Sequence, residues 1–138
     1  MNRLIIIFNF FKKYVDYKMG IYGAIVMGGI IFGINYHGTD NYCGALTAAL
    51  KQAVYTFLFG GIIMRMCELL ATNIKQKSLA LFAASFIPSV ISLSLTFAMH
   101  SLKGTPKPLA STIPTVFFVI PATIAWGIMK RKKHQAVN

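Results

Sequence analysis

Four long apolar stretches, separated by short polar segments, run along this chain of 138 residues. Each approaches or meets the roughly 20 residues that a helix needs to cross the hydrocarbon core of a bilayer. The four windows run from Gly20 to Tyr36, Gly44 to Met64, Leu79 to Met99 and Leu109 to Met129. The pattern therefore predicts an all-α integral membrane protein with four transmembrane helices.

A further helix is predicted ahead of the first window. As a helix, residues 4–16 place Asn9, Lys12, Lys13 and Asp16 on one face. The other face carries apolar side chains, those of Leu4, Ile7, Phe8, Phe11 and Val15. The apolar stretch runs into the two lysines without a small-residue cleavage site, so we expect it to be retained rather than removed as a signal peptide. Such a helix lies in the membrane interface, held by acyl chains and anionic headgroups. The alternative is a docking helix for another protein.

These elements divide the chain into five predicted segments. They are an amphipathic interfacial helix at residues 1–18, a first transmembrane hairpin at 19–66, a cytoplasmic loop at 67–78, a second hairpin at 79–129 and a basic tail at 130–138.

The basic residues predict the orientation. Most of the 14 lysines and arginines precede the first window, lie between the second and third, or follow the fourth. Because cytoplasmic loops carry the excess of these residues, both termini are expected in the cytoplasm. An uncleaved chain with basic flanks best fits a bacterial cytoplasmic (inner) membrane, with an organelle membrane as the alternative.

Composition supports this class and excludes others. With 56% hydrophobic and 12% charged residues and a mean hydropathy of +0.61, the chain is neither an ordinary soluble globule nor disordered. Its net charge of +11 lies beside apolar windows and not on a soluble face, so we expect no nucleic-acid partner.

The two halves of the chain share a few positions. The matches are Gly38 and Thr39 with Gly104 and Thr105, and Gly61, Ile62 and Arg65 with Gly127, Ile128 and Arg131. A true duplication would make the two hairpins parallel repeats, an arrangement in which transporters place ligand sites between the repeats. The alternative is chance similarity between lipid-facing sequences.

Lys51 is the most informative residue, because it places a cation inside the second window. Near the centre of a membrane helix a lysine costs roughly 2.5–3.5 kcal/mol on insertion scales. No acid lies at that depth, since Asp16 and Glu68 are expected in the cytoplasm and Asp40 in the outer loop. The amine can reach the outer headgroups along its own helix, bind an anionic ligand or headgroup in a cleft, or contact a partner subunit.

Two polar stripes surround this cation. Thr47, Lys51 and Tyr55 share a helical face in the second window, and hydroxyl residues recur at helical spacing in the third. The predicted ligand-binding residues are Thr47, Lys51, Gln52, Tyr55, Ser89, Ser92, Thr96 and His100, with His37 and Asp40 in the outer loop. The alternative for the hydroxyls is interhelical hydrogen bonding, worth about 0.6 kcal/mol each.

Catalysis is not expected. The best candidate group is His37, Asp40, Cys43 and His100, whose spacing matches neither a catalytic motif nor a zinc site. Only three acids occur in the chain, so we predict no metal and no cofactor.

Small residues along the first window complete the pattern. Gly20, Ala24 and Gly28, then Gly29 and Gly33, have the small-xxx-small spacing that lets another helix approach closely, either from within the chain or from a partner.

Two functions remain open. One is binding or translocation of an anionic amphiphile, a lipid or lipid-linked phosphate, between the two hairpins. The other is a non-catalytic accessory or anchoring subunit of a larger inner-membrane complex. The expected partners are membrane lipids together with other membrane subunits or further copies of the chain.

Overall fold

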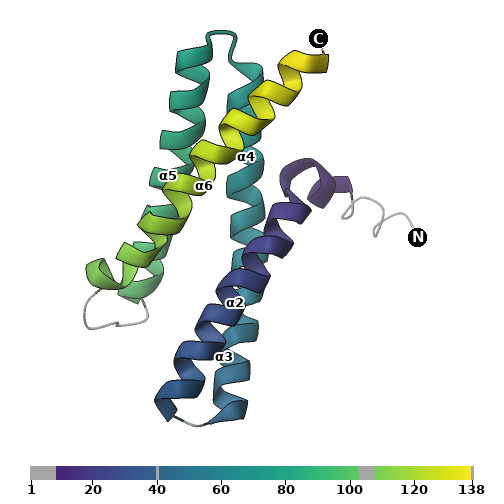
Figure 1. Ribbon diagram of the computed structural model, residues 1–138. Helices are drawn as coiled ribbons and strands as arrows, with labels where there is room; N and C mark the ends of the chain where they lie inside the picture. The colour runs from purple at the N-terminus through teal and green to yellow at the C-terminus, as the bar shows by residue number, and fades with distance from the viewer. Residues whose placement is uncertain (1–8, 40, 103–107, 138) are drawn as a thin grey trace. The chain divides into compact units, whose positions relative to one another are not determined.

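The computed structural model describes residues 9–39, 41–102 and 108–137. This part of the chain is helical and contains no strand, which confirms the all-α prediction (Figure 1). The elements are α2 (Tyr17–Thr39), α3 (Tyr42–Tyr55), the π-helical segment η1 (Thr56–Gly60), α4 (Gly61–Asn73), α5 (Lys77–Leu102) and α6 (Pro108–Val137). Residues 9–14 form a further helical stretch ahead of α2.

Some predicted features lie outside the described residues. They are the start of the interfacial helix at residues 1–8, Asp40, and the loop at 103–107 that contains the second Gly-Thr step. The side chains of Thr39 and His100 are likewise not described.

Among the described residues, three helical segments are long and apolar enough to cross a membrane. They are Tyr17–His37, Tyr42–Asn73 and Lys77–Met99. They contain the first three predicted windows, and the second is extended because α3, η1 and α4 follow one another without a break. The fourth window lies within α6, which is not among the three segments, so a count of four spans stays a prediction.

The chain divides into two compact units, residues 1–62 and 63–138, with the boundary near the start of α4. In the first unit, α2 and α3 each start with a side-chain cap. Asp16 Oδ1 accepts a hydrogen bond from the Met19 amide at 3.1 Å, and Asn41 Oδ1 accepts one from the Gly44 amide at 3.0 Å. Each cap satisfies a backbone donor that a helix start leaves without an intrahelical partner.

Helix α2 packs against α3 and η1 through small residues. A side chain at Gly28 would place its Cβ 3.3 Å from Ala53 Cβ and 3.4 Å from the Ala49 carbonyl oxygen. At Gly20 it would lie 2.7 Å from the Phe57 carbonyl oxygen. The partner of this face is therefore internal, and Ala49 is buried beneath it.

The segment that leads into α2 docks on the first residue of α4. The Asp16 amide donates a hydrogen bond to the Gly61 carbonyl at 2.9 Å. The side chain of Val15 approaches so closely that a Cβ on Gly61 would lie 2.5 Å from its Cγ1. Glycine is required there because the neighbouring side chain occupies the space of a Cβ.

The second unit contains most of α4 together with α5 and α6. Its core is formed by Cys67, Ala71 and Ala84, with Leu70 and Trp126 packed against them. Gly127 of α6 lets Ala84 and Cys67 pack close to the α6 backbone. A Cβ at Gly127 would lie 3.4 Å from Ala84 Cβ and 3.6 Å from the Cys67 sulfur. As in the first unit, small residues let the helices approach closely.

Candidate functional site

Lys51 lies on an exposed face of α3. Gly28 of α2 contacts α3 at Ala49 and Ala53, the positions on either side of Lys51. Lys51 is therefore level with Gly28, close to the middle of the 21-residue segment Tyr17–His37. In a bilayer this places the start of its side chain far from both headgroup layers.

The polar neighbours of Lys51 bond mainly to their own helix. The Thr47 hydroxyl donates to the Cys43 carbonyl at 2.8 Å, and Gln52 Nε2 donates to Thr56 Oγ1 at 3.1 Å. The ring of Tyr55, on the same face as Lys51, lies 4.7 Å from the ring of Phe59. The Lys51 ammonium itself forms no ion pair among the described residues.

Of the two predicted outer-loop residues, His37 lies at the end of α2, and Asp40 is outside the described residues. His37 is exposed in the last turn, with its ring 5.9 Å from that of Tyr36 in an edge-on arrangement. Cys43 is exposed in the first turn of α3, and neither it nor Cys67 is in a disulfide.

The stripe on α5 belongs to the second unit. Ser89 is buried, and its Oγ lies 3.0 Å from Thr123 Oγ1 of α6. The Thr96 hydroxyl donates to the Ser92 carbonyl at 2.9 Å, and Ser85 Oγ donates to the Leu81 carbonyl at 2.9 Å. The contact at Ser89 is thus an interhelical hydrogen bond, which is the alternative to ligand binding considered for these hydroxyls.

The predicted ligand set is thus found in two groups. The structure brings together Thr47, Lys51, Gln52 and Tyr55 on α3 in the first unit. It places Ser89, Ser92 and Thr96 on α5 in the second unit.

Sequence reasoning missed Thr123, which is fully buried and contacts Ser89, the residue after the buried Pro88. Proline lacks the amide that would bond to the preceding turn, so the helix loosens there. In that turn the Ser85 carbonyl oxygen lies 3.5 Å from Thr123 Oγ1. The available signal was a proline in one apolar window and, in the next, a threonine well inside the apolar stretch.

Sequence reasoning also missed the structural role of Arg131, although it matched this residue with Arg65 between the two halves of the chain. It is only 7% exposed, and its guanidinium donates to the carbonyls of Ala71 at 2.8 Å and Lys75 at 2.7 Å, and also to that of Ile74. Arg131 of α6 therefore caps the end of α4, whose last carbonyls have no helical partner.

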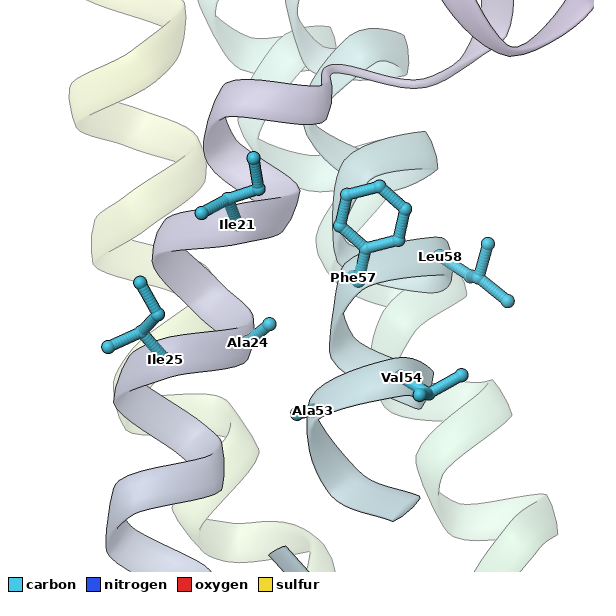
Figure 2. Close-up of a pocket in the computed structure, with 7 residues that line it drawn as sticks. All are labelled: Ile21, Ala24, Ile25, Ala53, Val54, Phe57 and Leu58. Atoms are coloured by element: carbon cyan, nitrogen blue, oxygen red, sulfur yellow. The ribbon is translucent and has the colours of Figure 1, made fainter. Parts of the chain in front are cut away.

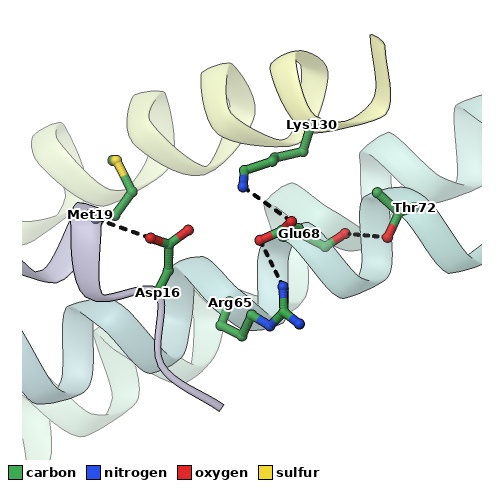
Figure 3. A network of polar contacts seen from close by, with 6 residues as sticks. All are labelled: Asp16, Met19, Arg65, Glu68, Thr72 and Lys130. Carbon is green, nitrogen blue, oxygen red and sulfur yellow. Dashed lines mark hydrogen bonds and ion pairs between the residues drawn. The ribbon is translucent and has the colours of Figure 1, made fainter. Parts of the chain in front are cut away.

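Glu68 is the centre of an ion-pair cluster on the same helices (Figure 3). Its carboxylate lies 3.0 Å from Arg65 Nη1 and 3.1 Å from Lys130 Nζ. Lys130 Nζ also lies 4.5 Å from the centre of the Trp126 ring. Because Glu68 is on α4 and Lys130 on α6, their ion pair joins the two helices.

Comparisons of the chain with protein-family models, with curated proteins and with solved structures find no match.

Proposed function

We propose that this chain is a small four-span membrane protein that binds or translocates an anionic amphiphile, a lipid or lipid-linked phosphate, through Lys51. Both termini lie in the cytoplasm, and the membrane is a bacterial inner membrane. The protein is not an enzyme in this proposal. Thr47 and Tyr55, on the same face of α3, flank the anion.

The observation that carries this proposal is the depth of Lys51. A bilayer core is about 30 Å thick, so a residue level with the middle of a span begins about 15 Å from either headgroup layer. That is farther than the four-carbon stem of lysine extends. Since its ammonium has no ion pair among the described residues, a bound phosphate supplies the charge that offsets its cost.

Exchanging Lys51 for methionine is the matched test. Methionine keeps an unbranched apolar stem of similar length and removes the cation. We expect native mass spectrometry of gently extracted protein to show about tenfold less retained anionic lipid, the effect of losing one charge-assisted hydrogen bond.

Lys77→Met is the control, because Lys77 is exposed at the start of α5. It should retain lipid like the wild type. Equal retention by the wild type and Lys51→Met would contradict the proposal, provided both are inserted at equal abundance.

A second candidate function, an accessory subunit, is favoured by an open face of α2. Side chains placed at Gly29 or Gly33 would meet nothing within 4 Å. Both glycines therefore leave room for a helix from another protein or from a second copy. Gly28, the residue before Gly29, packs within the hairpin instead.

Gly33→Leu separates a partner contact from hairpin packing. If the chain is a subunit, this variant loses its partner in a pull-down while the isolated chain stays as stable as the wild type. Gly28→Leu should instead destabilise the chain itself, because Ala53 and Ala49 occupy the space. Full assembly by Gly33→Leu would count against the subunit function.

A further inference from the structure

A shallow groove of about 320 Å³ runs between α2 and the helix formed by α3 and η1 (Figure 2). All of its lining side chains are apolar, and all belong to the first unit. They are Ile21, Ala24, Ile25, Ala53, Val54, Phe57 and Leu58. None of the predicted ligand-binding residues lines it, so the groove is distinct from the Lys51 face.

Residue size explains the shape of the groove. Ala24 and Ala53 come from opposite helices and are the smallest lining residues, so they leave space where larger side chains would meet. Ile25 and Val54 are 67% and 60% exposed and form raised edges. Such a trough fits one flexible hydrocarbon chain.

A cation precedes the groove residues along α2. Lys18 is exposed and precedes Ile21 and Ile25 by three and seven residues, so the three share one face of α2. It is the second residue of the segment Tyr17–His37, at the end where the span meets the membrane surface. The first turn of α2 contains no acidic residue, and the Asp16 carboxylate just before it accepts a hydrogen bond from the Met19 amide. A positive charge at the surface and an apolar trough below it match the two parts of an anionic phospholipid.

We propose that this groove binds an acyl chain of an anionic phospholipid, whose phosphate headgroup is held by Lys18. The site lies nearer the start of α2 than Lys51 does, and it needs neither Lys51 nor translocation. It therefore goes beyond the proposed function and can fail or succeed independently of it.

The test uses the full chain in vesicles of equal parts phosphatidylcholine and phosphatidylglycerol. A trace of either lipid carries a photoactivatable diazirine in its acyl chain, and labelled residues are mapped by mass spectrometry. We expect phosphatidylglycerol to label the groove residues about fivefold more than phosphatidylcholine, the preference that one lysine near an anionic headgroup confers.

Four variants separate the parts of the site. Lys18→Gln should make the two lipids label equally, whereas Lys77→Gln should keep the preference. Val54→Trp should fill the groove and reduce labelling by both lipids. Leu50→Trp, at a similarly exposed site one turn earlier that does not line the groove, should not.

Equal labelling of the wild type by both lipids would overturn the role of Lys18. Identical labelling of the Val54→Trp and Leu50→Trp variants would overturn the groove as the site. Lys51→Met should keep the preference for phosphatidylglycerol, and its loss there would overturn the independence of the two sites.

Discussion

Replacing Arg131 with methionine is expected to destabilise the packing of α4, α5 and α6 by about 3 kcal/mol, because hydrogen bonds from a charged donor are worth about 1.5–3 kcal/mol. Methionine retains an apolar stem but leaves the carbonyls of Ala71 and Lys75 without their donor. Lysine at this position should recover only part of the loss, since one ammonium cannot reproduce the planar fork of arginine.

Cys67 provides the measurement for this prediction. It is fully buried, whereas Cys43 is exposed, so a chain carrying Cys43→Ser reacts with a thiol-specific dye only when the second unit opens. Arg131→Met should lower the temperature at which the dye begins to label Cys67. Lys132→Met, at the exposed neighbouring position, should leave it unchanged. If the two variants behave alike, Arg131 does not stabilise the end of α4.

Replacing Gly20 with leucine should disrupt the hairpin of α2 and α3 at a cost of about 2–3 kcal/mol, typical of a side chain forced into filled space. The obstacle at 2.7 Å is the Phe57 carbonyl oxygen, a backbone atom that cannot rotate away. Gly29→Leu is the matched control, because the same substitution on the same helix enters open space.

A cysteine at Ala45 reports on this hairpin, since Ala45 is 1% exposed. In a chain with Ala45→Cys and Cys43→Ser, Gly20→Leu should speed dye labelling of the α3 peptide, while Gly29→Leu should not. Equal labelling rates would contradict the packing of α2 on η1.

The helices were predictable because apolar length and caps are local properties. The first window, Gly20 to Tyr36, lies inside α2, which starts earlier because Asp16 caps it. The small-residue face of that window was also visible. Its partner was not, since the spacing of Gly20 and Gly28 is the same whether the approaching helix is internal or foreign.

Features that depend on tertiary contacts were not predictable. The π-helical segment at Thr56–Gly60 sits where Gly20 approaches the Phe57 carbonyl, and no local pattern encodes that approach. In the sequence, Arg131 is one of several basic residues in the tail. Its role depends on the end of α4 lying beside it, which is a tertiary contact. Lys51 stood out because a cation in an apolar window is costly wherever the helices lie.

The contact between Lys51 and a phosphate is the most direct test of the proposed function. Solid-state NMR of the protein with ¹⁵N-labelled lysine, in bilayers of the phospholipids with which it co-purifies, measures dipolar coupling from lysine Nζ to phosphorus. We predict that the wild type and Lys77→Gln show a strong coupling from the Lys51 ammonium, as expected for a charge-assisted hydrogen bond. Lys51→Gln should lose this coupling and keep the one expected from Lys18. A spectrum unchanged by Lys51→Gln would contradict the proposal.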